Sequence, residues 1–193
     1  MIRRARLSVV LALLAGGAVG LIGSTQTWLD LTLSDGAQSV IAVTGGQALP
    51  VLAPLSLAAL ALGLALSIVG PVLRYAFGLL AVLLGAGLAF AAGRVALTLP
   101  PDAMSAAVAE ATGLSGPAAV ESLVADVAMT PWPAVTIAAA VLIVVGGVLA
   151  LATARRWPTS GRRYRSDAAS PDGAPRDAID SWDELSRGDD PTR

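Results

Sequence analysis

The sequence predicts an all-α membrane protein with four transmembrane helices, a small extracytoplasmic cap (a β-hairpin plus short helices) and a disordered cytoplasmic tail. Of the 193 residues, 55% are hydrophobic and 14% are charged, whereas soluble domains carry about 25% charged residues. The hydrophobic residues gather in four long runs, and most arginines lie near the termini. We therefore expect a transmembrane domain over residues 1–154 and a cytoplasmic tail, basic then acidic, over residues 155–193.

Each apolar run approaches the roughly 20 helical residues that cross a hydrocarbon core of about 30 Å. The expected spans cover about residues 7–23, 51–69, 75–97 and 133–154. The first is the shortest and follows three arginines, so a cleaved signal peptide is the alternative for this segment. With either interpretation, the residues that follow it emerge outside the cytoplasm.

Arginine positions orient the spans, because basic residues close to a span resist translocation. The segments assigned to the cytoplasm carry Arg3, Arg4, Arg6, Arg74, Arg155, Arg156, Arg162, Arg163 and Arg165. The two loops assigned to the outside, residues 24–50 and 98–132, carry no arginine. We expect a multi-pass protein of the cell (plasma) membrane with both termini in the cytoplasm.

The first outer loop has the pattern of a β-hairpin. Apolar and polar residues alternate over residues 27–33 and again over 38–44, and Asp35 and Gly36 lie between the two runs. An Asp-Gly pair between alternating runs is typical of a hairpin turn. Because a lone hairpin is only marginally stable, it should rest on the second outer loop or on the membrane surface.

The second outer loop predicts two short helices, over residues 103–112 and 117–129, separated by glycines. In the second helix the residues of the apolar face would be Val120, Leu123, Val124 and Val127. This spacing matches one face of a helix. We expect the cap to cover helix ends, with ligand binding as the alternative role.

Tryptophans and small residues mark the span limits and the helix contacts. We expect Trp28, Trp132 and Trp157 to act as interface anchors in the headgroup layer; packing within loops is the alternative. Small residues at helical spacing predict close helix contacts in the first three spans. These residues are Gly16 and Gly20, then Ala59, Gly63 and Ser67, then Ala81, Gly85, Ala89 and Gly93.

Arg94 is an intramembrane charge near the outer end of the third span. An ionisable residue at membrane depth is by default a functional-site hypothesis. At this depth the guanidinium can also snorkel outward and pair with an acid such as Asp30 or Asp102, which would make it an interfacial anchor.

The tail contains one apolar island within an acidic segment. Residues 167–193 carry eight acids and three arginines, a composition typical of disorder. We interpret the island as a docking motif for a cytoplasmic protein partner, with an inert terminus as the alternative. Its residues are Ile179, Trp182, Asp183, Leu185, Gly188, Asp190 and Pro191.

The composition disfavours most enzyme chemistry. The chain has no cysteine and no histidine, which removes thiol nucleophiles, serine–histidine triads and thiolate or imidazole metal sites. Outer acids such as Glu110, Glu121 and Asp126 could act as general acids, but no nucleophile accompanies them. We expect no catalytic residues, no metal, no cofactor and no nucleic-acid partner; the lipid bilayer is the expected surrounding.

The arrangement resembles the actinobacterial family of tryptophan-biosynthesis-associated (tryptophan-operon-associated) membrane proteins. The resemblance runs over most of the chain: a basic start, a first span leading to Trp28, a loop that ends with residues 44–50, and four spans. Its most specific part is the ending Trp182-Asp183-x-Leu185-x-x-Gly188-x-Asp190-Pro191-Thr192. The resemblance implies a link to tryptophan biosynthesis and no demonstrated activity.

Two functions are expected from these observations. The first is a non-catalytic accessory or scaffold protein whose tail motif recruits a soluble partner. The alternative is a small transporter or sensor of an aromatic or indole-like solute, with Arg94 and the outer cap near the site. The scarcity of polar residues in the spans argues against transport.

Overall fold

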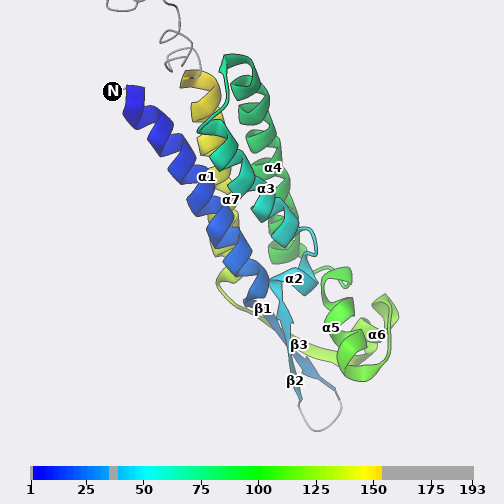
Figure 1. Ribbon diagram of the computed structural model, residues 1–193. Helices are drawn as coiled ribbons and strands as arrows, with labels where there is room; N and C mark the ends of the chain where they lie inside the picture. Colours follow the sequence, from blue (N-terminus) through cyan, green and yellow to red (C-terminus); the bar gives the residue numbers. More distant parts are fainter. Residues whose placement is uncertain (1, 35–38, 154–193) are drawn as a thin grey trace, which may run out of the picture. The chain divides into compact units, whose positions relative to one another are not determined.

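The computed structural model describes residues 2–34 and 39–153 of the chain. Four apolar helices run side by side: α1 (Ile2–Thr25), α3 (Leu52–Leu66), α4 (Pro71–Thr98) and α7 (Trp132–Thr153) (Figure 1). α1 contacts both α3 and α7, and α4 packs mainly on α7. The remaining elements connect these helices at the end where α1 passes into the first strand (Figure 1).

Three of the described helices are long and apolar enough to cross a membrane, and they correspond to the first, third and fourth predicted spans. Their apolar parts are Arg6–Thr25, Val72–Thr98 and Trp132–Thr153. The predicted second span, about 51–69, is not confirmed at its full length, since α3 has 15 residues. α4 begins at Pro71, and a proline disfavours a helical conformation of the residue before it, so the break between α3 and α4 includes Gly70.

Glycines of α1 bring two neighbouring helices into close contact with it. A Cβ atom at Gly16 would lie 2.8 Å from the backbone oxygen of Ala139 in α7, and one at Gly20 would lie 2.5 Å from Oγ of Ser56 in α3. Helices in lipid associate through such packing, because they gain little from the hydrophobic effect. The small-residue contacts predicted for α1 are confirmed.

The small-residue face predicted for α4 is confirmed only in part. A Cβ atom at Gly85 would lie 2.9 Å from the backbone oxygen of Ala140 in α7, whereas Gly93 has no described atom of a neighbour within 4 Å. The prediction for Gly93 was therefore wrong. This position falls outside the contact between α4 and α7.

A three-stranded antiparallel sheet follows α1, with strand order β2-β1-β3. The strands are β1 (Thr27–Leu33), β2 (Val40–Thr44) and β3 (Val124–Met129). β1 and β2 pair with Thr27 opposite Thr44, so the strands of the predicted hairpin are confirmed. Its turn at Asp35-Gly36 lies outside the described residues.

The helix predicted over residues 117–129 is wrong in its second half. α6 covers only Pro117–Leu123, and the chain continues as β3. β3 pairs with the second edge of β1, with Leu31 opposite Val127. This pairing satisfies backbone groups of β1 that an isolated hairpin would leave unpaired at an open edge. The prediction failed because the apolar spacing within residues 117–129 does not reveal that a distant strand is available for pairing.

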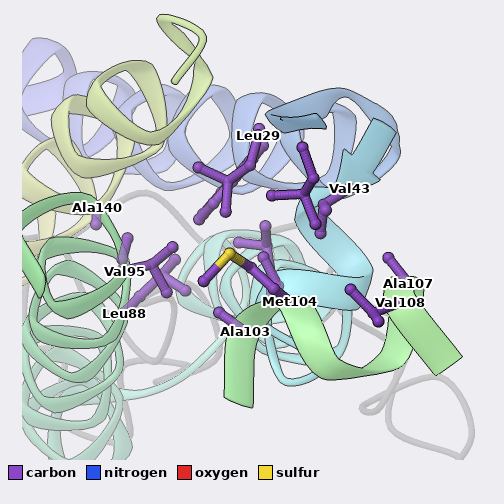
Figure 2. Close-up of a cluster of buried hydrophobic side chains, with 14 of the residues drawn as sticks. Leu29, Val43, Leu88, Val95, Ala103, Met104, Ala107, Val108 and Ala140 are labelled. Atoms are coloured by element: carbon purple, nitrogen blue, oxygen red, sulfur yellow. The ribbon is translucent and has the colours of Figure 1, made fainter. Parts of the chain in front are cut away.

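A continuous apolar core joins the sheet to the helices. It includes Leu29 and Val43 of the sheet, Met104 of α5 (Asp102–Thr112), and Leu88 and Val95 of α4. Figure 2 shows these side chains directed toward one another from the separate elements. The helix predicted over 103–112 is confirmed as α5, and its apolar side anchors the sheet to the end of the bundle where α1 passes into β1.

Candidate functional site

Arg94 lies one turn before the end of α4, and the chain then reverses direction so that α5 returns beside it. The reversal begins at Leu99, which adopts the left-handed conformation (φ 44°), and continues through Pro100 and Pro101 to the start of α5 at Asp102. Nη2 of Arg94 lies 2.6 Å from Oδ2 of Asp102. The side chains are 52% and 68% exposed, so both charges remain accessible.

This ion pair matches one of the two pairings expected from the sequence. Asp102 was one candidate partner of Arg94, and Asp30 was the other. Asp30 lies instead in β1, where it stands opposite Ala42 and Ala128. The described contact therefore links the end of α4 to the first residue of α5.

The pair borders a pocket of about 440 Å³, which we call the Arg94 pocket. Its wall comes from α2 (Gly45–Ala48) and the residues after it, from the last turns of α4 and from the first turns of α5. The lining residues are Gln47, Ala48, Leu49, Pro50, Phe90, Ala91, Arg94, Val95, Asp102, Ser105 and Ala106. Most of this wall is apolar and it includes the two charges, which is the usual composition of a small-molecule site.

Gln47 holds one wall of the pocket in place. Its Oε1 accepts a hydrogen bond from the backbone N–H of Thr44 at 2.9 Å, and its backbone N–H donates to Oγ1 of Thr44 at 3.3 Å. This reciprocal capping box stabilises the start of α2. Nε2 of Gln47 also donates to Oε2 of Glu110 in α5 at 3.0 Å, so α2 and α5 are tied together across the cap.

The chemistry available in the Arg94 pocket is ion pairing and hydrogen bonding. Arginine presents five N–H donors and cannot lose its proton in a protein, so it recognises carboxylates and phosphates. Asp102 accepts hydrogen bonds from cations and donors. Within the described ranges, no group of three or more carboxylates is placed to hold a metal ion.

Trp28, expected to be an interface anchor, is fully buried. Its indole Nε1 donates to the backbone oxygen of Gly23 at 2.9 Å. A ring enclosed by protein cannot lie among lipid headgroups, so the anchor prediction for Trp28 was wrong and packing within the protein explains it. Trp132 opens α7 and is half-buried against the core, and Trp157 lies outside the described residues.

The tail motif also lies outside the described residues, which end at residue 153. The structure therefore brings together Arg94 and its candidate partner Asp102, with Gln47 in the wall of the same pocket. It does not describe Ile179, Trp182, Asp183, Leu185, Gly188, Asp190 and Pro191. Gln47 was missed as a site residue. The Thr-x-x-Gln spacing at residues 44–47 is a capping-box pattern that could have indicated a helix start there.

Two buried hydroxyl groups were also missed. Ser56 in α3 and Thr136 in α7 are fully buried, and neither side-chain oxygen has a hydrogen-bond partner within the described part of the chain. They face α1 from two sides: Cβ atoms at Gly20 and Gly23 would lie 2.5 Å and 2.8 Å from these oxygens. A hydroxyl opposite a glycine fits the close helix approach described above.

The long apolar helices, their glycine contacts and the folded cap define a multi-pass membrane protein. The chain belongs to the family of tryptophan-associated transmembrane proteins, whose model matches residues 10–192. No functionally curated protein matches the chain, and no solved structure matches it. The family match spans the bundle, the cap and the tail motif, so the resemblance stated from the sequence is confirmed.

Proposed function

We propose that α3 is a fourth membrane span, that both termini lie in the cytoplasm, and that the sheet with α5 and α6 forms an extracytoplasmic cap of the cell membrane. α3 packs on α1 and α4 and exposes Leu57 and Leu64, and Ile68 just after the helix is also exposed, as lipid contact would require. Backbone hydrogen bonding also continues past the helix end, since the N–H of Val69 donates to the oxygen of Ala65. The arginine distribution supports the orientation.

Single-cysteine labelling tests this topology, because the native chain has no cysteine. We expect a membrane-impermeant maleimide to label Ser115→Cys in intact cells. It should label Ser170→Cys only after permeabilisation. Ser115 is an exposed cap residue, so lack of reaction cannot come from burial in the protein. Labelling of Ser170→Cys in intact cells would overturn the proposed orientation.

We propose that the protein is a non-catalytic accessory protein associated with tryptophan biosynthesis, and that it binds a small solute in the Arg94 pocket. The single observation that supports this function is that the exposed, oppositely charged side chains of Arg94 and Asp102 line a mostly apolar pocket of about 440 Å³. We favour a sensor over a transporter. The glycines of α1 let its backbone lie close to α3 and α7, and such close packing leaves little room for a solute path between these helices.

A deletion strain complemented with variants tests the accessory role. We expect the wild-type gene, but not Arg94→Leu, to restore the response of the intracellular tryptophan pool to external aromatic solutes. Ser115→Ala is the control, since it alters another exposed position near α5 without removing a charge. Full restoration by Arg94→Leu, at equal protein level, would contradict the proposed role of the pocket.

The sequence supports a second candidate function, recruitment of a cytoplasmic protein by the tail motif. A tryptophan flanked by Asp183 and Leu185 within an acidic segment offers an apolar anchor, and aromatic anchors commonly dominate binding energy. Crosslinking of the full-length protein in native membranes, with Trp182→Ala beside the wild type, tests this proposal. Identical partners at identical yield would contradict a docking role for Trp182.

A further inference from the structure

We infer that the Arg94 pocket selects a zwitterionic α-amino acid with a large apolar side chain. This inference rests on the proposed solute-binding function and specifies its ligand class. Nη2 of Arg94 and Oδ2 of Asp102 lie 2.6 Å apart at the edge of one pocket. A carboxylate and an ammonium on one carbon atom present the complementary pair of charges at similarly short range.

The hydrogen-bonding capacity of the pair is only partly used. The described bond of the Arg94 guanidinium uses Nη2, and a guanidinium has five N–H donors in all. A ligand carboxylate can accept from the remaining donors, in the bidentate arrangement that arginine favours. A ligand ammonium can donate to Asp102, whose two carboxylate oxygens have about four acceptor positions.

Charge balance distinguishes a zwitterion from a singly charged ligand. The Arg94–Asp102 pair is neutral as a unit, and it stays neutral when a zwitterion binds across it. An anion alone would draw Arg94 away from Asp102, and a cation alone would draw Asp102 away from Arg94. Either ligand satisfies only one of the two protein charges, whereas a zwitterion can form a charge-assisted hydrogen bond with each of them.

The apolar part of the pocket accounts for the side chain. Leu49, Phe90 and Val95 line it together with several alanines. A phenyl ring in the wall offers a surface on which another ring or a branched aliphatic group can pack. The volume of about 440 Å³ falls in the range of pockets that enclose small ligands, about 300–1,000 Å³.

Contacts other than the Arg94–Asp102 ion pair hold the walls of the pocket. The two charged side chains can therefore bind a ligand without unfolding the pocket. Gln47 bonds to Thr44 within its own turn and to Glu110 in α5. α5 is also anchored by Met104 and Val108 in the core. Such fixed walls reduce the ordering cost of binding.

Calorimetric titration of the full-length protein in lipid nanodiscs tests the ligand class. The probes are L-phenylalanine and L-tryptophan, with phenethylamine and 3-phenylpropionate as analogues that each lack one charge, and glycine as the ligand without a side chain. We expect L-phenylalanine to bind at least about tenfold more tightly than either singly charged analogue and than glycine, as the loss of one ionic contact would produce. Arg94→Leu and Asp102→Asn should each abolish this preference.

Asp126→Asn is the matched control, since Asp126 is an exposed carboxylate of β3 that does not line the pocket; it should bind L-phenylalanine as the wild type does. Equal affinity for 3-phenylpropionate or phenethylamine would overturn the amino-acid class and leave the solute site standing. Absence of binding by every probe, or binding that Arg94→Leu leaves unchanged, would overturn both the ligand class and the proposed solute site.

Discussion

Nε1 of Trp28 donates a hydrogen bond to the backbone oxygen of Gly23, 2.9 Å away. The bond ties the first strand back to the last turn of α1. Gly45, at the start of α2, lies against the same indole, since a Cβ atom there would be 2.5 Å from Nε1. Three segments therefore meet around one buried ring, which positions the cap on the bundle.

Gly45→Ala should destabilise the cap. The added methyl group would contact the oxygen of Gly23 and the indole of Trp28, and overpacking of this kind costs about 1–3 kcal/mol. Thermal unfolding of the purified protein, followed by tryptophan fluorescence, should show a lower Tm. Gly87→Ala is the control, because nothing lies within 4 Å of its added Cβ. Equal Tm values for the two variants would refute the proposed packing around Trp28.

Gly20→Ala should weaken the contact between α1 and α3, and Ser56→Ala should rescue it. The new Cβ atom would lie 2.5 Å from Oγ of Ser56 but 3.4 Å from its Cβ, so removal of the hydroxyl restores an ordinary contact distance. Ser56→Ala alone should be neutral or stabilising, since this buried oxygen has no described hydrogen-bond partner. A double-mutant cycle of unfolding measurements in detergent checks this; additive losses would show that the two side chains do not touch.

Gln47→Ala should loosen α2 from α5. The substitution removes the side-chain half of the capping box and the bond to Glu110, a loss of about 1–2 kcal/mol. Hydrogen exchange of α2 and α5 amides should rise relative to the wild type. Gln26→Ala is the control, because the described hydrogen bond of its side-chain amide goes to the neighbouring exposed Thr25 and not to another element. Faster exchange of α2 and α5 in the control variant as well would count against a specific role of Gln47.

Arg94→Leu should leave the fold almost unchanged. Both partners of its ion pair are more than half exposed, and exposed pairs contribute about 0–1 kcal/mol. The unfolding temperature and the protein level in membranes should therefore stay close to the wild-type values, with Arg94→Lys as the charge-conserving comparison. If Arg94→Leu fails to accumulate while Arg94→Lys accumulates normally, Arg94 is a structural anchor. An unchanged protein level together with an unchanged phenotype would make it neither anchor nor site.

Local sequence patterns predicted much of this fold. Hydropathy located the first, third and fourth apolar helices, because each is a long run of apolar residues whose backbone bonds within the helix. Alternation over residues 29–33 located the first strand, since Leu29, Leu31 and Leu33 are buried while Asp30 and Thr32 are more exposed. The second strand followed from the Asp-Gly pair and the β-branched residues after it. In both cases the residues whose pattern determines the secondary structure are close together in the sequence.

The remaining features depend on partners that are distant in the sequence. Val127 lies in a strand because the second edge of β1 is available to pair with it, and Trp28 is buried because Gly45 permits close approach. Among these contacts, only the pairing of Arg94 with Asp102 could be predicted from the sequence, since the two residues are eight positions apart. The pocket wall contributed by residues 47–50 had no local signal that pointed to Arg94.

The central position of α1 has a consequence for biogenesis. α3 packs against its Gly17 and Gly20, and α7 packs against its Gly16 and Gly23. A signal peptidase cut near residue 24 would strip away the helix that both neighbours share, and it would also remove the carbonyl that holds the Trp28 indole. The mature polypeptide should therefore retain its amino-terminal segment, and mass spectrometry of the isolated protein should find that segment intact.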